Sequence, residues 1–286
     1  MKTAGAPIAW GVSAMPGWGY QLDRARVLAE MRDLGFTATE LGPPGFLPPS
    51  PARRAALLAE YGLRGIGGFT PLVLHDPAFD PVPDVRATLR GYRDGDVEIA
   101  IFAAVANGTD YDLRPVLDST GWKTLLSNLG KIVAEGGRFG RRVVLHPHAG
   151  TAVASADEVS RVLDESDIPL CLDTGHLLLG GTDPAALVHA APGRIAQVHL
   201  KDVDAEFSAQ FRAGNLTYTE AVHAGLFRPL GQGELDTAAV VAALSGSGYD
   251  GWHVVAPDTA LSREPSPGEG PVTAVRASLE RLAGLT

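Results

Sequence analysis

Histidine, lysine and carboxylate side chains gather at the ends of short apolar runs in this sequence. Three consecutive runs, 142–145, 168–172 and 195–200, end in or lead directly into such residues: His146 and His148, Asp173 and His176, and His199, Lys201 and Asp202. Imidazole and carboxylate groups that converge from several elements suit a divalent cation such as Mn, Co, Zn or Mg. Such an ion would act as a Lewis acid that polarises a carbonyl or holds an enediolate.

The spacing within each group indicates which side chains share a face. His146 and His148 are two residues apart, as are His199 and Lys201, so on a continuing strand each pair points to one side. Thr174-Gly175 separates Asp173 from His176, and we expect a turn there that folds both side chains inward. The alternatives are structural: Asp173 could cap a following helix, and His199 could be a hydrogen-bonded core histidine.

Other polar residues follow further apolar runs. Glu40 ends the second run, His75 lies beyond the third, and Asp258 lies just past the last. Each has a structural alternative, since Glu40 could form a salt bridge inside the fold and His75 could stabilise a turn. The single cysteine, Cys171, lies within a buried run and is expected to pack rather than react.

The elements that must position these residues alternate along the whole chain. Apolar runs predict strands over 7–12, 37–41, 62–69, 97–103, 142–145, 168–172, 195–200 and 252–256. Helical spacing and capping residues predict helices over 23–34, from 50, over 84–92 and 121–135, from 155, from 183, and over 237–244 and 272–282. Eight strands, each followed by a helix, predict an α/β protein with a (β/α)8 TIM barrel, whose active site lies at the carboxyl ends of the strands.

We predict one barrel domain over residues 1–286, because no linker or change of composition divides the chain. Residues 203–234 are too long for an ordinary connection, so they are expected to form an active-site loop. The first turn, 13–19, lacks G-x-G-x-x-G, and the chain contains no G-x-S-x-G or P-loop. These absences disfavour a dinucleotide fold, serine hydrolysis and P-loop phosphoryl transfer.

The charge composition of the chain limits the classes of binding partner. The chain has 24 basic and 33 acidic residues and a net charge of −9, which disfavours nucleic acid and anionic membranes as partners. No apolar run approaches the roughly 18–20 residues of a membrane span. One cysteine and the lack of an apolar signal sequence in residues 1–7 lead us to expect a cytoplasmic protein.

Two motifs give the sequence a family resemblance. The stretches Leu170-Cys171-Leu172-Asp173-Thr174-Gly175-His176 and Gln197-Val198-His199-Leu200-Lys201-Asp202 resemble the xylose-isomerase-like barrel superfamily of sugar isomerases and epimerases. Within it, the chain looks most like the inosose (2-keto-myo-inositol) dehydratases. Further similar stretches are 67–69, 73–76, 146–151, 180–184, 218–222 and 228–231.

The resemblance implies a barrel that binds one divalent metal, with Asp173 and His199 as ligands joined by His146 or His148. Lys201 and His176 would be the acid or base, with Glu40 as a further catalytic candidate. The candidates for substrate contact are His75, Asp202, Asp258, Tyr218 and Arg228. The substrate would be a small polyol or keto-sugar, and analogy suggests a homodimer.

The sequence departs from the family pattern at the eighth strand. Family members place a metal-binding glutamate in a context like Gly-Trp-x-Val-x-Glu, whereas this chain has Ala256 there. Residues 152–155 also offer no acid after the fifth-strand motif. There are three explanations: Asp258 replaces the missing metal ligand, the loss of the glutamate inactivates the site, or the site has been repurposed. Three hypotheses follow: a metal-dependent dehydratase acting through an enediolate, an isomerase or epimerase on the same scaffold, and a metal-poor binding protein or biosynthetic enzyme.

Overall fold

A computed structural model describes residues 1–106 and 111–285. Eight parallel strands form a closed barrel in the order β1-β10-β7-β6-β5-β4-β3-β2. The strands are β1 (Lys2–Gly5), β2 (Ala38–Glu40), β3 (Arg64–Val73), β4 (Ile99–Val105), β5 (Arg142–Leu145), β6 (Leu170–Asp173), β7 (Ile195–Leu200) and β10 (Trp252–Val255). The predicted (β/α)8 fold is therefore confirmed.

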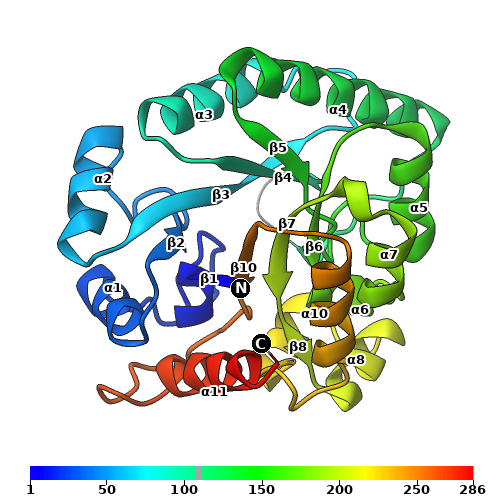
Figure 1. Cartoon of the computed structure of the whole chain (residues 1–286). Helices are drawn as coiled ribbons and strands as arrows, with labels where there is room; N and C mark the ends of the chain where they lie inside the picture. The colour runs from blue at the N-terminus through cyan, green and yellow to red at the C-terminus, as the bar shows by residue number, and fades with distance from the viewer. Residues whose placement is uncertain (107–110, 286) are drawn as a thin grey trace.

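Helices form an outer ring around these strands (Figure 1). They are α1 (Arg24–Asp33), α2 (Pro51–Glu60), α3 (Val82–Asp94), α4 (Ser119–Phe139), α5 (Ala156–Glu165), α7 (Pro184–Ala190), α10 (Thr237–Gly246) and α11 (Pro271–Ala283). Local sequence signals set several of their starts. The Ser50 side chain caps α2 with Pro51 in its first turn, and Ser155 with Glu158 forms a capping box at α5.

Small and branched side chains fill the barrel interior. One cluster includes Ala4, Ala38, Ile66 and Val254, from strands β1, β2, β3 and β10. A second cluster joins residues of β4, β5 and β6. Because strand side chains alternate in direction, the other residues of the strands pack against the helices. This rigid scaffold holds the ends of the strands in fixed positions around one opening.

The structure corrects the predicted first strand. Residues 7–12 do not pair in the barrel, and Pro7–Trp10 forms a short 3-10 helix, η1. Proline has no N–H for a strand ladder, and Gly11 ends the helix at a φ of 80°, which favours glycine. The true first strand is β1, whose short sequence Lys-Thr-Ala-Gly carries little apolar signal.

Two other segments are more regular than predicted. Thr174-Gly175 is the first turn of a helix, α6 (Thr174–Leu179), rather than an irregular turn. Residues 203–234 contain α8 (Ala205–Arg212) and α9 (Tyr218–Ala224), and β8 (Asp202–Val203) pairs antiparallel with β9 (Phe227–Arg228). Buried Tyr218 and Leu226 pack this segment against Trp18 and Leu179. Residues 203–234, which follow β7, therefore form a compact unit that packs against the barrel.

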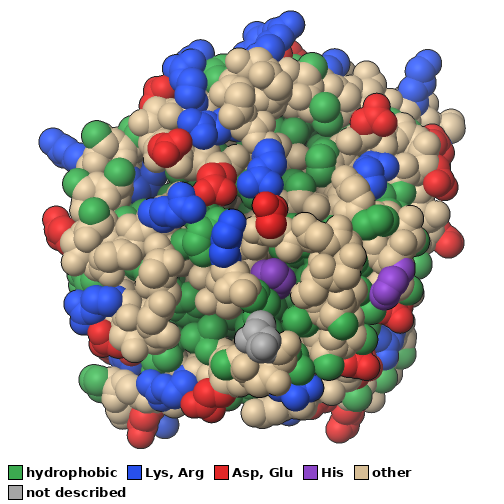
Figure 2. All heavy atoms as spheres, in the orientation of Figure 1, with side chains coloured by type: hydrophobic (Ala, Val, Ile, Leu, Met, Phe, Trp, Pro, Cys, Tyr) green, Lys and Arg blue, Asp and Glu red, His purple; other side chains and the backbone are tan. Residues whose placement is uncertain are grey.

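The surface gives no sign of a single-sign charged face in the view of Figure 2, where acidic and basic side chains are interspersed. Among the described residues, no helix combines the length and apolar character that crossing a membrane requires.

Candidate active site

A cavity of about 430 Å³ opens where the barrel strands end. Side chains from several strands, from α9 and from the segment after β10 meet at its polar side. The expected site residues among its lining are Glu40, His146, His148, His199, Lys201, Tyr218 and Asp258. The topology therefore brings together groups that lie more than 200 positions apart in the sequence.

Asp173 lies fully buried directly behind this lining. Its Oδ1 accepts the backbone N–H of His176 at 3.0 Å, so it caps α6 as one structural alternative foresaw. Its Oδ2 lies 3.0 Å from His146 Nε2, 3.4 Å from His199 Nδ1 and 3.2 Å from Lys201 Nζ. Burial raises the carboxyl pKa, but Lys201 and the histidines outweigh burial and hold the pKa well below its usual range. Asp173 is therefore an anion that orients side chains from β5 and β7.

Lys201 is the buried cation of the site. Its Nζ donates to Asp258 Oδ1 at 2.7 Å and lies 3.1 Å from His176 Nε2. Tyr218 donates its hydroxyl to the other Asp258 oxygen. Burial acts to lower the pKa of Lys201, but Asp173 and Asp258 raise it above its ordinary value. Lys201 is therefore protonated at neutral pH and can donate a proton or stabilise an oxyanion.

Glu40 and His199 form the other charged pair. His199 Nε2 lies 2.7 Å from Glu40 Oε1, which also accepts from Gln197 Nε2 at 3.0 Å. Burial raises the pKa of Glu40, but His199 more than offsets it and the pKa is lowered. Burial likewise opposes the charge on His199, whereas contacts with Cys171, Glu40 and Asp173 raise its pKa well above normal. Both ring nitrogens thus face carboxylates, the arrangement of a protonated imidazole.

His148, unlike His199, has a lowered pKa. Its Nδ1 donates to the carbonyl of Ala149 at 2.6 Å, which leaves Nε2 without a proton in the neutral ring. Burial and the nearby His176 hold the pKa of His148 well below its usual value. Its ring lies between those of Tyr111, 4.5 Å away, and His176, 3.6 Å away. His148 is therefore an unprotonated nitrogen base held in a fixed orientation.

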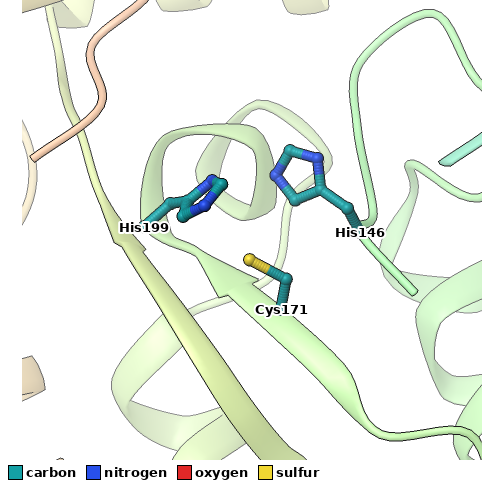
Figure 3. Close-up of side chains that lie close together, drawn as sticks. All are labelled: His146, Cys171 and His199. Atoms are coloured by element: carbon teal, nitrogen blue, oxygen red, sulfur yellow. The ribbon is translucent and has the colours of Figure 1, made fainter. Parts of the chain in front are cut away.

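The donor set fits a divalent cation. Three groups bring three possible ligand atoms close together: His146, Cys171 and His199; His146, Asp173 and His176; and His148, His176 and Asp258. Figure 3 shows His146 and His199 reaching toward one another above the Cys171 sulfur. His146 Nδ1 is buried and finds no hydrogen-bond partner among the described residues, and burial lowers the His146 pKa to about 4, so this nitrogen is available as a ligand.

Charge supports the same fit. The carboxylates of Glu40, Asp173 and Asp258 outnumber the two cations, Lys201 and a protonated His199, so the cluster is negative overall. Ala256 is buried and lines the cavity but supplies no ligand atom. Asp258 groups with His148 and His176 instead of with His199. The carboxylate that follows β10 is thus displaced toward α6, relative to the pattern that the resemblance implies.

Asp173 and His176 lie directly behind the cavity lining, in contact with Lys201. Three other expected site residues lie neither in the lining nor in this cluster in the described structure. His75 is partly buried, with its Nδ1 unpartnered among the residues described. Arg228 is exposed and pairs with Asp204 at 2.9 Å. Asp202 is fully buried, and its carboxylate accepts backbone N–H groups of Val203, Gly231, Gly233 and Leu235. Asp202 thus fastens the segment after β7, which is a structural task.

Sequence reasoning also missed residues of the site. Gln197 precedes His199 by two positions on β7, so strand alternation alone could have placed its amide beside Glu40. Tyr111, whose ring lies 4.5 Å from that of His148, belongs to no helix or strand, so no periodicity could have marked it. Met15, Pro43 and Phe69 line the cavity and carry no chemical signature in a sequence.

Comparison with known proteins identifies the family. A family model described as "Xylose isomerase-like TIM barrel" matches residues 28–283. The chain belongs to this family. Its resemblance to the inosose dehydratases is also borne out: it is 31% identical to an inosose dehydratase of Geobacillus kaustophilus over 87% of this chain and 85% of the relative.

Two further similarities extend the comparison. A rhizopine catabolism protein, MocC, of Rhizobium meliloti is 29% identical over 99% of this chain and 88% of its own. Among solved structures, an IolI protein with a bound zinc atom superposes with a TM-score of 0.70 at 16% identity. That match covers 100% of this chain and 98% of the other, and it demonstrates a shared fold.

Proposed function

We propose that this protein is a metal-assisted hydro-lyase that removes water from a cyclic polyhydroxy ketone, a keto-cyclitol or keto-sugar. The coarser statement, an enzyme that modifies sugars or polyols, rests on the family and on relatives named inosose dehydratase. One observation carries the finer proposal: Lys201, whose ammonium contacts Asp173 and Asp258, and His148, whose Nδ1 donates to a carbonyl, line the same cavity. Elimination of water from a β-hydroxy ketone needs one proton acceptor and one proton donor.

The first step is assigned to His148. Its Nε2 takes the proton from the carbon next to the carbonyl, and the electron pair of that C–H bond moves toward the carbonyl oxygen to give an enediolate. Asp173, His199 and His146 would hold the divalent cation, which supplies Lewis-acid polarisation of the carbonyl when it is bound. Because Cys171, Glu40 and Asp173 raise the pKa of His199, binding of the cation through its ring would release a proton.

The second step is assigned to Lys201. Its ammonium gives a proton to the hydroxyl on the next carbon, the C–O bond breaks, and water leaves as the carbon–carbon double bond forms. This leaves Lys201 neutral and His148 protonated. The ring of His176 stacks 3.6 Å from that of His148, and its Nε2 lies 3.1 Å from Lys201 Nζ. His176 is thus placed to help return the proton and reset both groups.

Hydrogen exchange separates the two roles. With 2-keto-myo-inositol in D₂O, H148Q should lose both exchange of the α-hydrogen and loss of water, whereas K201M should keep exchange and lose at least 100-fold in elimination. H223Q, at an exposed histidine of α9, is the matched control and should behave as the unchanged protein. Exchange that survives in H148Q would contradict the assignment of the base.

Epimerisation is the second candidate, and Glu40 favours it. Glu40 is a second group held in its unprotonated form, and it lines the same cavity as His148. Two bases that act on opposite faces of a ring carbon could remove and return one proton with inversion, which leaves the mass of the substrate unchanged. Product mass therefore decides between elimination and epimerisation.

A metal-poor protein is the third candidate. Ala256 in place of a ligand favours it, as do the contacts of the Lys201 ammonium with Asp173 and Asp258. Elemental analysis after incubation with Mn²⁺, Co²⁺ or Zn²⁺ tests it. About one ion per chain supports the hydro-lyase, and a protein that retains none supports a binding role.

A further inference from the structure

The cavity at the barrel mouth has two chemically different walls. Its polar wall consists of groups from β5, β7 and the segment after β10, such as His148, Lys201 and Asp258. The strand order places β1, β2 and β3 across the barrel from β5, β6 and β7. Across from it, β3 and the loops after β1 and β2 supply a largely apolar side, with Ile8, Met15, Pro43, Pro44, Phe69 and Pro71. The charged group among the described residues of this side is Glu40 at the end of β2, and its Oε1 is already bonded to Gln197 and His199.

This apolar wall is a surface of the cavity rather than sealed core. Met15, Pro43, Phe69 and Pro71 are partly exposed, and Pro44 is exposed. Met15 and Ile8 rest on the buried cluster around Trp18 and Tyr218, which fixes them from behind. The wall is thus a supported apolar surface that a ligand can cover.

A bare polyol matches this cavity poorly. A keto-inositol carries a hydroxyl on every ring carbon except the ketone, so hydroxyls point outward all around the ring. Among the described residues that line the apolar side, those with side-chain hydroxyls are Ser13, Thr70 and Thr88. Hydroxyls pressed against proline, methionine and phenylalanine would lose hydrogen bonds to water and gain none.

We infer that the preferred substrate is a polyhydroxy ring that carries an apolar substituent, such as an aryl or long-chain alkyl group joined through oxygen. The polar wall would hold the ring, and the apolar wall would cover the substituent. A cavity of about 430 Å³ is in the size range of pockets that bind drug-sized ligands, which are larger than one ring. This inference deepens the proposed function and rests on it for the orientation of the ring.

Binding of two matched probes tests the inference without turnover. Phenyl β-D-glucopyranoside and methyl β-D-glucopyranoside differ in the apolar group and lack a ketone, so isothermal titration calorimetry measures affinity alone. We expect the phenyl glycoside to bind at least tenfold more tightly, because the ring buries apolar surface against the wall. In M15Q the ratio of the two Kd values should fall below threefold. V116Q, at an apolar residue 92% exposed and outside the cavity lining, is the matched control and should keep the ratio.

The outcomes distinguish this inference from the proposed function. Equal or weaker binding of the phenyl glycoside, or failure of both probes to bind, overturns the inference, as does an unchanged ratio in M15Q. If 2-keto-myo-inositol is dehydrated while the phenyl group gives no advantage, the inference fails and the proposed function stands. If the phenyl glycoside binds more tightly but no ketone is dehydrated, the apolar wall is a binding site and the proposed function fails.

Discussion

Replacement of Asp202 by alanine tests whether this residue stabilises the fold or contacts the substrate. Its carboxylate accepts four backbone N–H groups, at 2.9 Å from Val203, 2.8 Å from Gly231, 3.0 Å from Gly233 and 2.9 Å from Leu235. These bonds fasten residues 231–235 to the end of β7, across nearly thirty intervening positions. Asp202 has a relative accessibility of 0%. Its removal leaves the backbone donors of Val203 and Leu235, which are buried, without this partner.

The loss of unfolding free energy in D202A can be estimated from the hydrogen bonds that these donors lose. A hydrogen bond to a charged group contributes about 1.5–3 kcal/mol, and a buried group left unpaired costs about 1–3 kcal/mol. The four bonds share one carboxylate, and part of the segment can relax toward water, so the effects do not sum. We expect D202A to lower the free energy of unfolding by about 3–5 kcal/mol, which places it among the large single-residue effects.

Denaturant unfolding followed by circular dichroism measures this change. The matched control is D204A, two positions along, where the aspartate caps α8 and pairs with exposed Arg228. An N-cap aspartate contributes about 0.5–2 kcal/mol, so D204A should cost distinctly less than D202A. A D202A protein within 1 kcal/mol of the unchanged chain would refute the structural reasoning. A loss of ligand affinity with an unchanged free energy of unfolding would instead support the predicted role of Asp202 in substrate contact.

Three further predictions concern the metal and the pH dependence. D173N and H199A should each reduce retained metal at least tenfold in elemental analysis while circular dichroism stays unchanged, and undiminished metal in both would reject these ligands. A256E adds a carboxylate at the cavity and should tighten Mn²⁺ or Zn²⁺ binding at least tenfold by calorimetry, whereas no gain would mean that position 256 does not reach the ion. Burial lowers the pKa of His253 to about 4 from an ordinary 6.5, so the unfolded chain binds a proton between these values and stability rises with pH across that window. H253N should remove about 2–3 kcal/mol of this pH dependence of the free energy of unfolding. Parallel pH profiles for H253N and the unchanged protein would contradict the lowered pKa.

The sequence predicted the barrel because its local signals agree with its tertiary structure. Capping residues such as Ser50 and Asp183 mark where helices begin, and the apolar runs of β5 and β7 coincide with the predicted ranges. The first strand escaped prediction because the apolar stretch that follows it is a 3-10 helix opened by proline. Pairing with β10, more than 240 positions away, sets β1, and such a contact leaves no local pattern.

The candidate site was predictable in composition but not in roles. The rule that barrel sites lie at strand ends was enough to select Glu40, His146 and Lys201, which the structure places on one cavity. The rule selects every polar residue at a strand end, so it did not separate Lys201 from Asp202. These neighbours point in opposite directions, and Lys201 alone of the two lines the cavity. Charge states were also beyond reach, because the pKa of His148 depends on burial and on a carbonyl contact that only the fold creates.

The most direct test of the central claim is the mass of the product formed from 2-keto-myo-inositol in the presence of Mn²⁺, Co²⁺ or Zn²⁺. Liquid chromatography with mass spectrometry would follow the reaction, with K201M protein as the control for spontaneous loss of water. We predict a product lighter than the substrate by one water with the unchanged protein and none above background with K201M. A product of unchanged mass but altered retention would identify an epimerase instead, and an unreacted ketone in the presence of retained metal would contradict the hydro-lyase.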